Sequence, residues 1–196
     1  MALFFLIRHA ENDYVGRRLA GWSPDVHLNE EGRAQAGRLA DRLANTGISV
    51  LYSSPLERAL ETAAPLAERL GLEVQIRDAL GEIRFGEWTG HYIEDLRQDP
   101  LWQHYNAFRS STRAPGGESM LDVQLRIVTE IESLRRQHTD GTIAIVSHGD
   151  AIRAAVLHYA GIPLDLMHRI EISTASVSVI SVEDHGPQVL GLNCAP

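Results

Sequence analysis

Two short, wholly apolar runs, each followed at once by a polar segment with a histidine, constrain this chain most. Phe4 to Ile7 precedes Arg8-His9-Ala10, and Ile143 to Val146 precedes Ser147-His148-Gly149. Such runs are typical of strands buried on both faces, as in a parallel sheet. In open parallel sheets, ligands bind beyond the carboxyl ends of the strands. A single histidine at a strand end is more often simply packed, but two alike ends lead us to expect both histidines in one crevice.

The rest of the pattern alternates short strands with amphipathic helices. Further strands are predicted at 50–52 and 74–76, and a pair of edge strands within 170–182, which is rich in β-branched residues and serine. Helices are predicted at 29–43, 54–70, 118–136 and 149–159. This alternation predicts an α/β fold: a three-layer sandwich with a mostly parallel sheet, an antiparallel edge strand and helices on both faces.

Two of the predicted helices carry signals for their ends and for their buried faces. In helix 54–70, Ser54 is predicted to cap the start with Glu57 completing a capping box, and Gly71 to end it. Its predicted apolar stripe is Leu56, Leu60, Ala63, Ala67 and Leu70. For helix 118–136 we expect the inward residues to be Leu121, Leu125, Val128, Ile131 and Leu134.

A length of 196 residues predicts one domain over 1–196. Residues 84–116 lack clear periodicity and are rich in aromatic side chains, so we interpret them as a small cap-like insertion over the active site. The aromatic residues could cover an organic part of a bound ligand or simply pack beneath a loop. Arg84, Arg97, Arg109 and Arg113 of this segment could contact a second acidic group of a substrate.

Composition excludes several classes of function. The net charge of −8 argues against an extended nucleic-acid surface. All 18 basic residues are arginines, so a P-loop lysine and a Schiff-base lysine are excluded. The apolar run at the N-terminus is too short for a signal-peptide core, no stretch approaches the roughly 20 apolar residues of a membrane helix, and Cys194 has no partner for an internal disulfide. We therefore expect a cytoplasmic protein that does not bind membranes.

Arg58 adds a third element to the two histidines. It falls in the first turn of helix 54–70, where the helix dipole disfavours a cation. An exposed ion pair with Glu57 or Glu61 is one explanation, and an anion bound between Arg58 and the free N–H groups of the helix start is the other. Arg8 would face the same anion, and two arginines with a histidine suit a phosphate group.

Six motifs in order resemble those of the histidine phosphatase superfamily, also called the phosphoglycerate mutase-like family. Together they cover residues 7 to about 165. They are Arg8-His9-Ala10-Glu11; Gly21 to Asp25 with Leu28, Gly32 and Gln35-Ala36; Tyr52 to Ala59 with Thr62-Ala63; Leu80 to Gly90, which contains Glu82; Pro115 to Ser119; and Val146 to Gly149.

The resemblance implies a role for each site residue. His9 would be a nucleophile that is transiently phosphorylated, Glu82 the proton donor and acceptor, and Arg8, Arg58 and His148 a phosphate clamp. Asn12 and Gly149 complete the expected substrate-binding set, and neither a metal nor a cofactor is implied.

These roles also make physical sense. His9 must be neutral to attack, and neighbouring arginines lower a histidine pKa. Its other ring nitrogen needs an acceptor, for which a backbone carbonyl is the natural choice. Glu82 must carry a proton near neutral pH, and an adjacent phosphate dianion raises a carboxyl pKa.

The sequence departs from the family pattern beside the nucleophile. Ala10 stands where glycine is usual, Asn12 where Ser or Thr is common, and Tyr14-Val15 where many members have Trp-Asn. That family asparagine helps to bind phosphate, so Asn12 is a candidate to replace it.

Hydrolysis of a small phosphorylated metabolite is the favoured activity, because an insertion of about thirty residues is short for a mutase. A phosphoglycerate mutase and a catalytically silent phospholigand-binding protein are the alternatives. A metallohydrolase is a third, but there is no His-Glu-x-x-His and the other histidines are scattered. The oligomeric state is open, and a homodimer is one alternative.

Overall fold

A six-stranded mixed sheet forms the centre of the molecule. The computed structural model describes residues 2–183 and 185–195. In spatial order the strands are β3 (Val74–Ile76), β2 (Val50–Ser53), β4 (Thr142–Ser147), β1 (Ala2–Arg8), β5 (Val177–Glu183) and β6 (Gly186–Cys194). The first four run parallel, β5 is antiparallel to β1, and β6 is antiparallel to β5. The predicted mostly parallel sheet with an antiparallel edge is confirmed.

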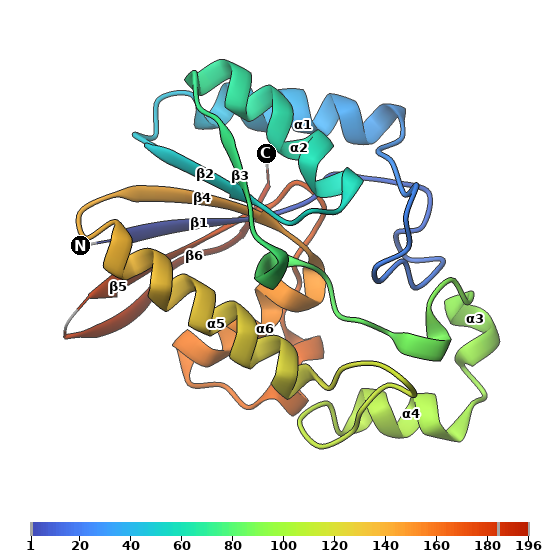
Figure 1. The fold of residues 1–196 in the computed structure, drawn as a ribbon. Coiled ribbons are helices and arrows are strands. Elements are labelled where there is room, and N and C mark those ends of the chain that lie inside the picture. The colour runs from blue at the N-terminus through green and yellow to red at the C-terminus, as the bar shows by residue number, and fades with distance from the viewer. Residues whose placement is uncertain (1, 184, 196) are drawn as a thin grey trace.

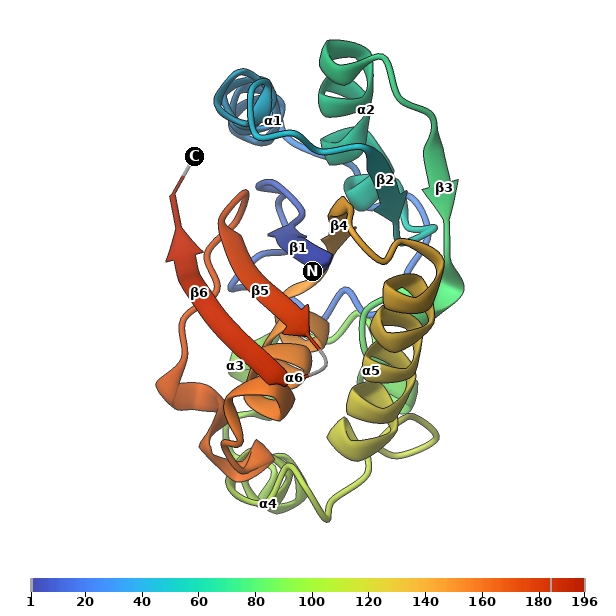
Figure 2. The ribbon, with the colours of Figure 1, turned by 90° about the vertical axis from the view of Figure 1, so that its left-hand side faces the viewer.

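Helices cover both faces of this sheet (Figures 1 and 2). One face carries α1 (Glu30–Leu43) and α2 (Glu57–Leu70), and the other carries α5 (Met120–Gln137) and α6 (Gly149–Ala160). The side chains of β1 alternate between the two layers: Phe4 and Leu6 pack with α5 and α6, and Ile7 packs with α1 and α2. The three-layer sandwich is therefore confirmed.

The start of α2 differs from the prediction. Leu56, not Ser54, is the N-cap residue, and no side chain caps the helix. The Ser54 hydroxyl accepts only a long hydrogen bond from the Leu56 N–H, at 3.3 Å, and lies 2.7 Å from His148 Nε2. The capping box was wrong because the serine contacts the second histidine instead, whereas Gly71 ends the helix in the left-handed conformation as predicted.

The predicted buried face of α2 was also wrong in register, whereas that of α5 was wrong near the start of the helix and confirmed at Ile131 and Leu134. In α2 the buried residues are Arg58, Ala59, Thr62, Ala63 and Leu66, so of the predicted stripe within the helix only Ala63 is fully buried. In α5 they are Met120, Val123, Ile127, Ile131 and Leu134. Leu121 and Leu125 are exposed. Each helix carries two overlapping apolar series with helical spacing, and packing against the sheet selects one of them.

The late strands lie further along the chain than expected. Residues 170–182 were predicted to contain two strands, but they contain one, β5, apart from its last residue. Its antiparallel partner β6 begins at Gly186. The η3 turn (Leu164–Arg169) and the segment after it instead carry the chain back from α6. No helix within the described residues is long and apolar enough to cross a membrane.

Two irregular segments lie beyond the carboxyl ends of the parallel strands (Figure 1). One is the loop over 9–29, and the other is 84–116, which contains η2 (Gly86–Trp88), α3 (Ile93–Leu96) and α4 (Pro100–Ala107). Hydrogen bonds join them: the Ile93 N–H donates to Arg17 O and the Leu19 N–H to His91 O.

Three of the six Phe, Trp and Tyr side chains of 84–116 pack on one another. Trp88, Trp102 and Tyr105 are buried, with ring centroids 5.2 to 5.8 Å apart. Of the two readings of these residues, the packing one therefore holds for this trio. Among the residues that line the pocket described next, the segment contributes Phe85 and Ile93.

Candidate active site

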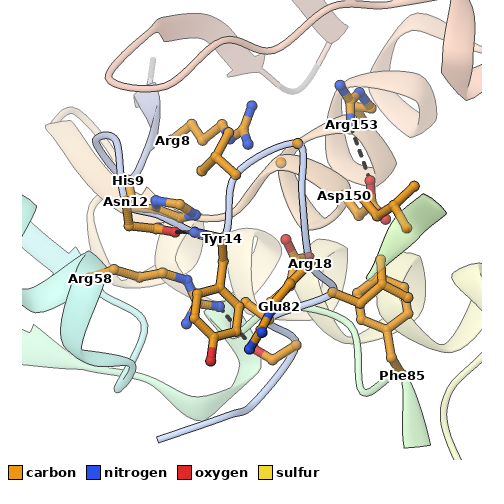
Figure 3. A pocket seen from close by; sticks show the side chains of 17 residues that line it. Arg8, His9, Asn12, Tyr14, Arg18, Arg58, Glu82, Phe85, Asp150 and Arg153 are labelled. Atoms are coloured by element: carbon orange, nitrogen blue, oxygen red, sulfur yellow. Dashed lines mark hydrogen bonds and ion pairs between the residues drawn. The ribbon is translucent and has the colours of Figure 1, made fainter. Parts of the chain in front are cut away.

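A pocket opens where β1 and β4 end, under the loop over 9–29 (Figure 3). It gathers most of the residues that the sequence singled out. The lining residues are Arg8, His9, Asn12, Tyr14 to Gly16, Arg18 to Gly21, Arg58, Glu82, Phe85, Ile93, Gly149, Asp150 and Arg153. Of the predicted site residues, His148 alone is absent from this lining; its ring is fully buried behind His9.

His9 follows directly on β1 and is held in one orientation. Its backbone N–H donates to Ser147 O on neighbouring β4, at 2.9 Å. Its ring Nδ1 lies 2.8 Å from the Ala10 carbonyl, which can only accept, so the proton resides on Nδ1 and Nε2 keeps its lone pair. Burial and the charges of Arg58 and Arg8 hold the pKa of His9 well below 6.5. The imidazole is thus neutral with a free nucleophilic nitrogen.

Buried nitrogen donors without partners surround His9. Arg58 is 1% exposed, and its Nη2 donates to Gly21 O at 2.7 Å. Arg8 donates through Nη1 to Ile172 O at 2.6 Å. Within the described part of the chain, five buried nitrogen atoms of predicted site residues have no hydrogen-bond partner: Arg8 Nε, Asn12 Nδ2, Arg58 Nε, Arg58 Nη1 and His148 Nδ1. Unpaired buried donors are costly, so such a cluster is suited to an anion.

His148 ends β4 as His9 ends β1, and the two rings lie close together. Their centroids are 5.2 Å apart. Burial and Arg58 lower the pKa of His148 well below 6.5, so this ring is neutral too. If the Ser54 hydroxyl donates to Nε2, the ring proton lies on Nδ1, the atom without a partner. The two strand ends therefore meet as the sequence indicated.

Glu82 lies on the loop after η1 (Asp78–Leu80) and lines the same pocket as Arg8, His9 and Arg58 (Figure 3). Its Oε1 accepts a hydrogen bond from the Ile83 N–H at 2.9 Å. Burial, and then the negative charge of Asp150, raise the pKa of this carboxyl, while Arg58 and Arg8 act in the opposite direction. The balance favours a protonated carboxylic acid over a wider pH range than a solvated glutamate has.

Gly149 is the first residue of α6 and lines the pocket, so its backbone N–H belongs to a helix N-terminus that faces the pocket. A Cβ at this position would lie 3.3 Å from Arg8 Nε. A side chain here would have to displace the Arg8 guanidinium by a few tenths of an ångström, so glycine suits this close approach.

Asn12 brings a side-chain amide into the pocket, whereas the family pattern has its asparagine at the position of Val15. It is 2% exposed, and its Oδ1 accepts from the Tyr14 N–H at 3.0 Å. This bond turns the amide so that Nδ2 is left without a partner among the described residues, beside His9. An asparagine donor is thus present in the pocket, although it comes from a different position.

Sequence reasoning assigned no role to several residues of the site. Thr62 Oγ1 accepts from the Ala10 N–H at 2.9 Å and donates to Arg58 O at 2.7 Å, which ties the nucleophile loop to α2. Asp150 and Arg153 line the pocket as an ion pair 3.1 Å long. The motif containing Thr62 was visible in the sequence, but an acid in the first turn of α6 is an ordinary helix-start signal.

The sequence profile of the histidine phosphatase superfamily, branch 1, matches residues 4–195. This chain belongs to that superfamily. Its expected resemblance is therefore confirmed over almost the whole length.

Members of the superfamily with named activities are similar along most of the chain. Phosphoserine phosphatase 1 of Hydrogenobacter thermophilus is 34% identical over 201 residues, covering 98% of this chain and 92% of that protein. Glucosyl-3-phosphoglycerate phosphatase of Mycobacterium tuberculosis is 34% identical over 159 residues, covering 76% and 71%. The structure of an Entamoeba histolytica phosphoserine phosphatase in complex with phosphoserine superposes with a TM-score of 0.87 at 26% identity, covering 98% and 97%. These relatives favour a phosphatase over the mutase alternative.

Among the described residues, no three His, Cys, Asp or Glu side chains gather where they could hold a metal ion. That the reaction needs no metal stays a prediction, which a chelator tests directly.

Proposed function

We propose that this protein hydrolyses phosphomonoesters of small metabolites through a phosphohistidine at His9. The observation that carries the proposal is the set of five unpaired buried nitrogen donors on Arg8, Asn12, Arg58 and His148, next to a neutral imidazole whose Nε2 is free. Donors of this kind match the equatorial oxygens of a phosphoryl group, whose transfer depends mainly on positioning and charge stabilisation.

The first half of the reaction forms the phosphoenzyme. The lone pair of His9 Nε2 attacks phosphorus, the ester P–O bond breaks, and the leaving alkoxide takes the proton of Glu82. The raised pKa of Glu82 supports this role, because it increases the fraction of the carboxyl that holds a proton when substrate arrives.

The second half regenerates the enzyme. The Glu82 carboxylate takes a proton from water, the water oxygen attacks phosphorus, and the P–N bond to His9 breaks to release inorganic phosphate. The Ala10 carbonyl keeps the proton on Nδ1 throughout, so His9 returns in the same tautomer.

Phosphoserine is the first substrate to test. Two phosphatases that are similar to this chain carry that substrate in their names, and Arg18 and Arg153 line the pocket together with the clamp, where a carboxylate of the leaving group could pair. Phosphoglycerate has the same distal carboxylate and is the natural second substrate.

Rapid acid-free quenching with labelled phosphoserine tests the proposal. We expect a transient acid-labile phosphoenzyme and release of inorganic phosphate, both unaffected by a chelator. Both should be lost in His9→Ala and kept in His91→Ala, a matched control because His91 is exposed on the segment 84–116.

Turnover of phosphoserine by His9→Ala at the wild-type rate would remove His9 from the mechanism. Interconversion of phosphoglycerates that depends on bisphosphoglycerate, without net release of phosphate, would instead identify a mutase.

A further inference from the structure

Arg126 of α5 donates three hydrogen bonds to the loop that carries Glu82 and two to the carboxylate of Glu118. A guanidinium has five N–H donors in a planar fork. Nη1 donates to Ala79 O and Gly81 O, both at 2.8 Å, and Nη2 donates to Glu82 O at 2.9 Å. The remaining two donors, on Nε and Nη2, pair with Glu118 at 3.0 and 3.2 Å.

Glu118 holds the other side of the same loop. Its Oε2 accepts from the Arg84 N–H at 2.9 Å, and its own N–H donates to Arg84 O at 2.8 Å. The ion pair therefore fixes backbone groups both before and after Glu82. Trp22 adds a third hold, since its indole N–H donates to Glu82 O at 2.6 Å.

The Arg126–Glu118 ion pair also lies at the base of the segment 84–116. The chain enters this segment near Arg84 and leaves it near Glu118, and the two backbone pieces lie in close contact there. A Cβ on Gly117 would lie 2.2 Å from Arg84 O, and a Cβ on Gly86 would lie 2.0 Å from Pro115 O. Arg126 and Glu118 are four-fifths buried or more, so water competes little for these bonds.

By contrast, the Glu82 carboxyl itself has a single hydrogen bond among the described residues, to the Ile83 N–H. Its position relative to His9 is thus set by the backbone of its loop. We propose that the Arg126–Glu118 pair is the positioning element that sets the proton donor of the reaction, acting through the main chain at 79–84. The inference rests on the proposed role of Glu82, because Arg126 does not line the pocket.

Arg126→Lys is the main test, because lysine keeps the positive charge but has only three donors and no planar fork. We expect kcat/KM for phosphoserine, which reports formation of the phosphoenzyme, to fall roughly 10- to 100-fold, since a small displacement of a catalytic group has effects of that size. For para-nitrophenyl phosphate, whose leaving group needs no proton, kcat/KM should change by less than about three-fold, because kcat/KM does not include the later hydrolysis step, in which Glu82 acts as base with every substrate. KM for phosphoserine should change little, because the phosphate donors remain.

A second variant and a matched control guard against loss of folding. Glu118→Gln should give the same leaving-group pattern in weaker form. Arg135 lies nine residues further along α5 and pairs with Glu132, so Arg135→Lys should leave the turnover of both substrates unchanged. The yield of phosphoenzyme from para-nitrophenyl phosphate counts the competent His9 sites, so all rates refer to folded protein.

The double variant Arg126→Lys/Glu82→Gln separates the two hypotheses. If Arg126 acts through Glu82, adding Arg126→Lys to Glu82→Gln should cost nothing further on phosphoserine. Equal losses of kcat/KM on both substrates, or multiplied losses in the double variant, would reject the positioning role while leaving Glu82 as the acid. Absence of any leaving-group dependence in Glu82→Gln alone would instead reject the proposed role of Glu82.

Discussion

Arg58, at 1% exposure, is one of the largest side chains that the described part of the fold buries fully. A guanidinium taken out of water without enough partners is strongly unfavourable, and Arg58 retains two unpaired nitrogen atoms. Burial accordingly lowers its pKa, although it stays protonated because the ordinary value is so high. The site thus stores unmet hydrogen-bonding capacity, which binding of an anion satisfies.

The two buried histidines predict an acid sensitivity of the fold. His9 and His148 have pKa values well below 6.5 in the native state, so between those values and 6.5 the unfolded chain binds more protons. These two histidines should therefore cost no stability above about pH 6.5. Below that pH the free energy of unfolding should decrease, by at most about 1.4 kcal/mol per pH unit for each histidine.

Urea unfolding from about pH 8 to about pH 5 measures this effect, and His9→Asn removes one titrating group. As pH falls, the free energy of unfolding should decrease more in wild type than in His9→Asn. Glu82 acts with the opposite sign, since its raised pKa removes stability as pH rises above 4.5, but it does so in both proteins. A difference that does not vary with pH would show that His9 is not held neutral.

At the scale of elements, the loop after His9 is fixed by its contacts with two helices. Thr62 of α2 holds the Ala10 N–H, and Gln35 of α1 holds the Glu11 N–H at 2.9 Å. The loop passes so close to α1 that a Cβ on Gly32 would lie 2.0 Å from Glu11 O. Packing of α1 therefore depends on a glycine within its first turn.

Gly32→Ala and Gly37→Ala make a matched pair on α1. The Gly32 variant must push Glu11 away, so it should lower the free energy of unfolding by about 1–3 kcal/mol and also slow turnover, because His9 is two residues from the displaced group. Gly37 has open space around its Cβ position, so its alanine variant should stabilise the protein by up to about 1 kcal/mol through helix propensity.

Thermal unfolding and phosphoserine turnover measure both variants. Unchanged stability and activity in Gly32→Ala would mean that the loop can move away from α1 without consequence for the nucleophile.

For the whole molecule, the pocket couples segments that are far apart along the chain. Arg8 comes from the end of β1, Asn12 from the loop that follows, Arg58 from α2, Glu82 from the connection to 84–116, and Gly149 from α6. An anion that bridges these segments binds only the native state and should stabilise the fold as a unit.

Inorganic phosphate, as the product of the proposed reaction, should therefore raise the melting temperature. At a concentration of 100 times its Kd, the added stability is about 2.7 kcal/mol. Arg58→Ala should abolish most of this shift, whereas Arg69→Ala, an exposed arginine on the same helix, should keep it. An equal phosphate-dependent shift in both variants would place Arg58 outside the binding site.

The sequence alone determined the alternation of strands and helices, the two apolar strands and the histidines that end them. These follow from local patterns, since side-chain periodicity and strand polarity put His9 and His148 at one edge of the sheet. The remaining family motifs then pointed to Arg8, Arg58 and Glu82, and the structure places all of these residues around or beside one pocket.

Tertiary structure decided which face of each helix is buried and which polar groups meet. Leu125 and Ile127 both fit a helical apolar series, yet only Ile127 is buried, because the choice depends on the sheet that α5 packs against. Ser54 contacts His148 instead of capping α2, and Arg126 grips the Glu82 loop, both across long sequence separations. Sequence spacing predicts neighbours within an element, but contacts between elements exist only once the layers pack and bring distant donors and acceptors within hydrogen-bonding distance.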